Sequence, residues 1–185
     1  LAVPNSETRW SADRPSLVPG KPVTLNWSNG NGLRFRRVVS VDEHYLFTVT
    51  QRVYNDRKSP VTLYPWGRVS RNGTEVRGGT DVPMAGTYIH TGPVGVLEGT
   101  LREKDFEDLR DEGEYQATST GGWLGMKEQY WLVALIPNQK TKINASFSHE
   151  GRKNQIDRYH VSFIENGGHT VQPGQMIEVT SRLFA

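Results

Sequence analysis

Short runs in which apolar and polar residues alternate are the feature that most constrains how this chain folds. Val23, Leu25 and Trp27 alternate with polar neighbours. After the sequence Asn-Gly-Asn-Gly the alternation resumes at Leu33 and Phe35. A period of two residues is typical of a strand with one buried face, and Asn-Gly favours a tight turn between antiparallel strands. The pattern therefore predicts a β-hairpin.

Further segments along the chain have the same character. Residues 45–54 are rich in β-branched and aromatic residues, which favours a long half-buried strand. Residues 61–64 follow after a turn, so we predict that they pair with 45–54 and complete a meander of three strands. Other strands are expected near residues 143–147, 158–164 and 176–184.

The middle of the chain gives mixed signals. Residues 67–96 contain many glycines, so we expect mainly loops there, with a strand near 87–90. Residues 101–112 are highly charged and place Phe106 and Leu109 at helical spacing. This segment fits either a short amphipathic helix or an edge strand.

The tryptophans are divided by their surroundings. Residues 130–136 carry apolar groups on both faces, which predicts a strand buried on both sides, with Trp131 in the core. Trp27 is expected in the core as well. Trp66 and Trp123 lie beside proline or glycine, so we expect them nearer the surface.

Composition limits the class of protein further. The 185 residues are 35% hydrophobic and 23% charged, which is typical of a folded chain, and we predict one β-sandwich domain over residues 1–185 with an irregular lead-in at 1–20. Interspersed charges with a net charge of +2 argue against nucleic-acid binding. The chain begins at Leu1 and has no apolar run of about 20 residues, so we expect a soluble piece of a longer protein.

Few residues of the sequence indicate a metal, cofactor or phosphate site. There is no cysteine, which excludes disulfides and cysteine-containing zinc sites. None of the five histidines pairs with another at the spacing of helix-borne metal ligands, so we expect structural or solvated histidines and neither metal nor cofactor. Arg34, Arg36 and Arg37 form a basic cluster that fits the solvated side of a hairpin better than a phosphate site.

Four stretches in the second half of the chain carry a family resemblance. In order and spacing they are similar to the periplasmic domain of the bacterial membrane protein insertase YidC, and residues 45–55 and 87–90 add weaker similarity. The four stretches are Gly121-Gly122-Trp123, Gln129-Tyr130-Trp131, Ala134-Leu135-Ile136-Pro137 and Val171-Gln172-Pro173-Gly174-Gln175.

The resemblance implies an all-β fold and a function in binding. The implied fold is a galactose mutarotase-like β-supersandwich of antiparallel sheets with at most one or two short helices, lacking the family domain's first strands and its C-terminal helical segment. The implied place is the periplasmic face of the inner membrane, as part of a membrane-embedded parent protein. The implied partners are SecD, SecF and other Sec translocon components, or nascent membrane proteins. The candidate contact residues are Ile89, His90, Trp123, Gln129 and Tyr130.

Two other functions remain open at this point. A mutarotase-like sugar epimerase would use a histidine and a carboxylate for proton transfer, for which His90 with Glu98 or Glu114 is the pair to test. A carbohydrate-binding module or adhesin would use exposed aromatic residues. Because a fold does not determine a function, neither follows from the implied architecture alone.

Overall fold

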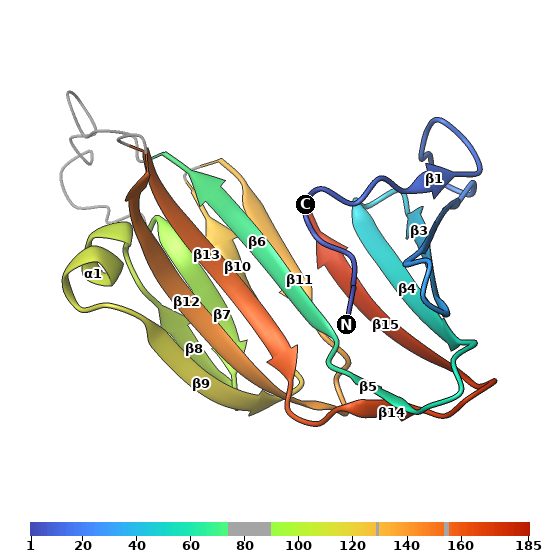
Figure 1. Ribbon diagram of the computed structural model, residues 1–185. Coiled ribbons are helices and arrows are strands. Elements are labelled where there is room, and N and C mark those ends of the chain that lie inside the picture. Colours follow the sequence, from blue (N-terminus) through green and yellow to red (C-terminus); the bar gives the residue numbers. More distant parts are fainter. Residues whose placement is uncertain (74–89, 129, 154–155) are drawn as a thin grey trace, which may run out of the picture. The chain divides into compact units, whose positions relative to one another are not determined.

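Antiparallel β-strands make up most of the structure, a computed structural model that describes residues 1–73, 90–128, 130–153 and 156–185 (Figure 1). The predicted all-β fold is confirmed, and the residues described include one short helix. Among the described residues, no helix has the length and apolar character needed to cross a membrane. The chain divides into two compact units, residues 1–65 with 166–185, and residues 66–165. The assignment of a single domain stays a prediction.

The first unit contains an antiparallel sheet with the strand order β1-β2-β3-β4-β15, and a separate pair formed by β14 and β5. The Asn-Gly-Asn-Gly segment joins β2 to β3 as predicted, with Gly30 and Gly32 at positive φ. The strands are β1 (Ser11–Ala12), β2 (Val23–Ser28), β3 (Leu33–Val41), β4 (Leu46–Asn55), β5 (Val61–Leu63), β14 (His169–Val171) and β15 (Met176–Phe184).

The predicted meander is wrong in its third strand. Besides β3, β4 pairs with β15, with Thr50 opposite Thr180. The strand β5 pairs instead with β14, a three-residue strand that the sequence pattern did not reveal. Asn55 accounts for the change of partner, because its buried side chain donates hydrogen bonds of 2.9 Å to the carbonyls of both Ser59 and Val171. These bonds tie the turn after β4 to the end of β14.

The second unit contains two groups of antiparallel strands. The order of the first group is β6-β13-β12-β9, and that of the second is β11-β10-β7-β8. The elements are β6 (Trp66–Asn72), β7 (Gly92–Leu97), β8 (Thr100–Glu103), α1 (Phe106–Asp111), β9 (Tyr115–Thr120), β10 (Trp123–Lys127), β11 (Leu132–Ile136), β12 (Lys142–Lys153) and β13 (Ile156–Glu165).

Several predictions for this unit need correction. Both alternatives for residues 101–112 occur, because the edge strand β8 is followed directly by α1, which starts at a capping box of Asp105 and Asp108. The glycine-rich stretch contains two well-formed strands, β6 and β7, where loops were expected. Of the strand expected at 87–90, residues 87–89 lie outside the described residues and His90 lies outside any strand.

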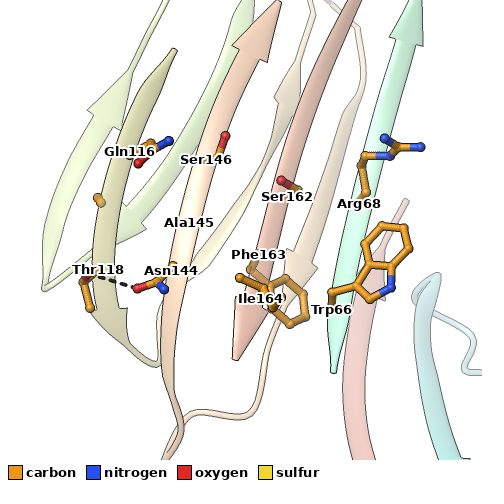
Figure 2. Close-up of a pocket in the computed structure, with 11 residues that line it drawn as sticks. Trp66, Arg68, Gln116, Thr118, Asn144, Ala145, Ser146, Ser162, Phe163 and Ile164 are labelled. Atoms are coloured by element: carbon orange, nitrogen blue, oxygen red, sulfur yellow. Dashed lines mark hydrogen bonds between the residues drawn. The ribbon is translucent and has the colours of Figure 1, made fainter. Parts of the chain in front are cut away.

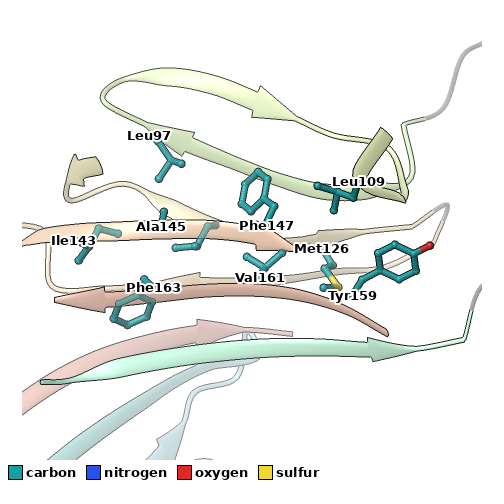
Figure 3. Close-up of a cluster of buried hydrophobic side chains, with 10 residues drawn as sticks. Leu97, Leu109, Met126, Ile143, Ala145, Phe147, Tyr159, Val161 and Phe163 are labelled. Carbon is teal, nitrogen blue, oxygen red and sulfur yellow. The ribbon is translucent and has the colours of Figure 1, made fainter. Parts of the chain in front are cut away.

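The two faces of the β6-β13-β12-β9 sheet differ sharply in chemistry. One face is mostly polar and open to solvent (Figure 2). The other packs against β7, β10 and α1 and forms the core of this unit (Figure 3). Its buried cluster consists of Leu97, Leu109, Leu124, Met126, Ile143, Ala145, Phe147, Tyr159, Val161 and Phe163.

Candidate functional site

The candidate contact residues from the sequence lie between positions 89 and 130. Ile89 and Gln129 lie outside the described residues. His90, Trp123 and Tyr130 occupy three different environments, so the structure does not gather them into one patch.

Tyr130 and Trp131 lie side by side in the turn that joins β10 to β11. The amide of Glu128 donates a hydrogen bond of 2.9 Å to the carbonyl of Trp131, which closes the turn. Tyr130 is 87% exposed and Trp131 is 41% exposed. The prediction that Trp131 belongs to the core is therefore wrong. The continuous apolar run concealed a reversal of the chain, which places both aromatic side chains beyond the strand.

The base of this turn is fixed by polar contacts. The Arg71 guanidinium, from β6, forms an ion pair with the Glu128 carboxylate, and both side chains are largely buried. The same guanidinium lies 4.9 Å from the centroid of the Phe106 ring in α1. Partly buried ion pairs with several contacts hold geometry better than exposed ones do. The turn therefore presents two aromatic rings from an anchored base.

Trp123 lies at the other end of β10, opposite Val96 of β7 and half-buried. Its position at the start of a strand agrees with the sequence analysis, but it is more enclosed than Trp131. Trp123 and Tyr130 are separated by the whole length of β10. A binding partner can contact both Trp123 and Tyr130 only if it also covers β10, which lies between them.

His90 is buried between two acidic residues of the β8–α1 segment. Its Nδ1 atom lies 3.7 Å from the Glu103 carboxylate, and its Nε2 atom lies 3.7 Å from Asp105 and 3.3 Å from the carbonyl of Lys104. The carboxylates proposed as its partners in a sugar epimerase are engaged elsewhere. Glu98 accepts a hydrogen bond of 3.2 Å from the amide of Thr120, and Glu114 accepts one of 2.5 Å from the Ser146 hydroxyl.

The open face of the β6-β13-β12-β9 sheet is a second candidate, which sequence reasoning missed. It contains a hollow of about 600 Å³. The strand register places two rows of side chains across it, as Figure 2 shows. The first row is Trp66, Ile164, Asn144 and Thr118, and the second is Arg68, Ser162, Ser146 and Gln116.

A hydrogen-bonded chain of three side chains lies farther along the same face. The Ser70 hydroxyl is 2.9 Å from Nδ1 of His160, and Nε2 of His160 is 3.2 Å from the Glu150 carboxylate. The connectivity resembles a nucleophile, base and carboxylate, but the Glu150 side chain is 56% exposed, so water competes with the imidazole for its carboxylate. We therefore interpret this chain as a cross-strand polar contact on a solvated face.

His149, Arg34 and Arg37 make structural contacts. His149 contacts the buried carboxylate of Asp157 at 2.9 Å. Within the described ranges, no group of three or more histidine or acidic side chains is arranged to hold a metal, and the expectation of no metal stays a prediction. In the first unit, Arg34 forms hydrogen bonds of 2.5 and 3.0 Å with Asp56, which lower the pKa of that carboxyl. Burial lowers the pKa of the Arg37 guanidinium.

Comparison with known proteins covers the whole chain. The family model described as the YidC periplasmic domain matches residues 2–185. Proteins named membrane protein insertase YidC are similar in sequence, with 40% identity over 192 residues in Granulibacter bethesdensis, 39% over 188 in Beijerinckia indica and 33% over 186 in Rickettsia bellii. Each alignment covers 100% of this chain. The chain spans 30–32% of the length of these relatives.

Solved structures support the fold alone. A galactose mutarotase related enzyme from Lactobacillus acidophilus matches with a TM-score of 0.62 at 9% identity, over 96% of this chain and 71% of that one. A galactose mutarotase-like protein from Clostridium acetobutylicum matches with a TM-score of 0.56 at 9% identity, over 96% and 66%. These likenesses confirm the mutarotase-like β-sandwich architecture and carry no argument about activity.

Proposed function

Because the chain belongs to the YidC periplasmic domain family, we propose that it functions by binding proteins at the periplasmic face of the bacterial inner membrane and not by catalysing a reaction. Its relatives are named membrane protein insertases. In this proposal the domain aids the insertion and folding of inner-membrane proteins. The binding partners are SecD, SecF or other components of the Sec translocon, or nascent membrane proteins.

The observation that carries the proposal is the pair of exposed aromatic residues at the β10–β11 turn. Tyrosine and tryptophan are enriched among residues that dominate protein interfaces, because each buries a large area at low cost in side-chain entropy. Tyr130 and Trp131 together expose such a surface on an anchored turn. An aromatic pair held in place before binding loses little conformational freedom when a partner covers it.

The proposal is tested by pull-down and by titration of the periplasmic regions of SecD and SecF against the 185-residue chain. The double substitution Tyr130→Ser with Trp131→Ser is expected to weaken binding at least about tenfold, the effect of losing one strong interface residue. The control is Trp66→Ala, which removes a comparably exposed tryptophan from the open sheet face.

Three outcomes decide the matter. Loss of binding in the double variant with retention in Trp66→Ala supports the proposal. Equal binding by all three chains places the contact elsewhere and removes the turn from the proposal. If neither SecD nor SecF binds the unmodified chain, the same titration with a nascent membrane-protein segment tests the remaining partner, and failure there as well overturns protein binding as the function.

A further inference from the structure

The open face of the β6-β13-β12-β9 sheet differs from an ordinary solvated sheet face. Such faces are usually covered by long charged side chains, which keep the sheet wet. Here Trp66 is 54% exposed, and its cross-strand neighbour Ile164 is 43% exposed. The next positions carry the short side chains of Ser162 and Ser146, which leave the hollow between the edge strands. An apolar platform therefore borders a polar depression.

The polar groups that line this hollow are mostly uncharged. They comprise two amides, Gln116 and Asn144, and three hydroxyls, Thr118, Ser146 and Ser162. Each amide and each hydroxyl can both donate and accept hydrogen bonds. Among the described residues that line the hollow there is no carboxylate, although the Glu114 carboxylate accepts a hydrogen bond from the Ser146 hydroxyl. The one cation among these lining residues is Arg68, whose guanidinium lies 5.7 Å from the centroid of the Trp66 ring.

The charges of the lining argue against two classes of ligand, polyanions and cations. A polyanion such as a nucleic acid is bound by several lysines and arginines along its backbone, and one guanidinium does not meet that requirement. A cationic ligand would need an available carboxylate or an aromatic cage. Glu114, the carboxylate beside the described lining, is engaged by the Ser146 hydroxyl, and the single indole of Trp66 does not form a cage. The site therefore favours an uncharged ligand.

The position of the hollow on a sheet face argues against a peptide. Extended peptides are usually recognised by hydrogen bonding to the edge of a sheet, and helices by an apolar groove. This hollow lies over the middle of the sheet, where Ser146 and Ser162 are on paired inner strands. Its exposed large apolar side chains, Trp66 and Ile164, lie together at one end.

From the exposed indole beside a field of neutral hydrogen-bonding groups, we infer that this face binds an uncharged oligosaccharide. The apolar C–H face of a sugar ring packs against the Trp66 indole, and the hydroxyls of this and the adjoining sugars bond to the amides and hydroxyls of the two rows. Four strands spaced about 4.8 Å apart span roughly 14 Å, which accommodates a few sugar units laid across the strands. Arg68 donates to neighbouring hydroxyls from the edge of the site.

The test uses nuclear magnetic resonance spectra of the 15N-labelled chain. Its five tryptophans give five indole N–H signals, and the signal missing from Trp66→Ala identifies that of Trp66. Cellotetraose, maltotetraose and chitotetraose are the neutral probes. At least one is expected to shift the Trp66 signal saturably, and Trp66→Ala is expected to weaken its binding at least tenfold. Gln116→Ala should weaken binding several-fold, and Trp131→Ala, outside the hollow, should leave the affinity unchanged.

The remaining outcomes overturn the inference. The first is an unshifted Trp66 signal with all three probes, and the second is an affinity for the probe in Trp66→Ala equal to that of the unmodified chain. The third is tighter binding of the anionic tetragalacturonate, or of a neutral glycine-serine peptide, than of the neutral tetrasaccharides. Signals distant from the hollow, unchanged in Trp66→Ala and Gln116→Ala, show that these variants remain folded. The test of partner binding uses Tyr130→Ser with Trp131→Ser and takes Trp66→Ala as its control, whereas Trp66→Ala is the disrupting variant here and Trp131→Ala the control. The failure of one proposal is therefore distinguishable from the failure of the other.

Discussion

The two units of this chain hold their strands in place by different means. In residues 66–165, ten buried side chains from β7, α1, β10, β12 and β13 form one apolar cluster (Figure 3). In the other unit the buried apolar residues lie outside this cluster, and polar side chains such as Asn55 and Asp42 fix the turns between strands. The comparison indicates that packing of apolar side chains between layers holds the strands of residues 66–165. In the other unit, the strands depend more on the alternation of apolar and polar residues along each strand and on polar contacts at the turns.

The largest effect is expected from truncating the core of the second unit. Phe147 has no exposed surface, and its ring centroid lies 5.3 Å from that of Tyr115. Phe147→Ala should lower the free energy of unfolding by about 3–5 kcal/mol, because it removes buried apolar contact and leaves a cavity. Denaturant unfolding measures this change.

The matched substitution in the first unit is Phe35→Ala. The Phe35 ring is half-buried, and its centroid lies 5.4 Å from that of Trp27 on the neighbouring strand. It should cost clearly less stability than Phe147→Ala, since the side chain already contacts water. Equal losses for the two variants would contradict the distinction between the units.

A buried polar group is expected to matter next most. Asn55 donates to two carbonyls, and its side-chain oxygen accepts a hydrogen bond of 3.0 Å from the amide of Arg57. Asn55→Ala should lower the free energy of unfolding by about 1–3 kcal/mol, because it leaves backbone groups in this buried region without partners. Asn31→Ala, in the exposed β2–β3 turn, is the control and should change stability little. A loss no larger for Asn55→Ala than for Asn31→Ala would show that the polar side chain does not hold this turn.

The same difference explains what the sequence could predict. In the first unit β2, β4 and β15 were predicted to within one residue at each end, because apolar and polar residues alternate along them. Of β3 the sequence identified the first residues, Leu33 to Phe35, because glycines mark the turn before it. The partner of β5 was wrong because pairing depends on contacts distant in sequence, here between residues 61–63 and 169–171.

In the second unit, glycines concealed two strands. Position 67 of β6 requires glycine, because a Cβ atom there would come within 2.6 Å of the Phe163 ring. Position 95 of β7 requires glycine for the same reason, since a Cβ atom there would come within 2.6 Å of the Trp123 carbonyl oxygen. Glycine in a strand marks close approach as well as turns, and only the tertiary structure distinguishes the two.

The candidate sites were predictable to a limited degree. Tyr130 was identified through a family resemblance and is indeed on the surface, whereas Trp131 required knowledge of the turn. The open sheet face was missed because its residues come from four strands, of which β6 was itself unrecognised. A usable signal existed at Trp66, which the sequence already placed near the surface.

The smallest effect on stability is expected from removing one charge at a turn of the first unit. In the turn between β3 and β4, the Asp42 carboxylate accepts hydrogen bonds of 2.9 Å from the amides of Leu46 and His44, which lower its pKa. Because the pKa is lowered on folding, the carboxylate stabilises the folded chain at pH values above the unfolded pKa of about 3.9, and this contribution is lost as the pH falls through the folded pKa.

Asp42→Asn keeps an acceptor oxygen but no charge. Thermal melts at stepped pH should therefore show the variant melting below the parent chain at pH 7, with the gap closing at strongly acidic pH. Glu43→Gln, which removes a neighbouring exposed charge, is the control and should show no such closing gap. A gap for Asp42→Asn that persists unchanged into acid would mean that the carboxylate charge does not stabilise this turn.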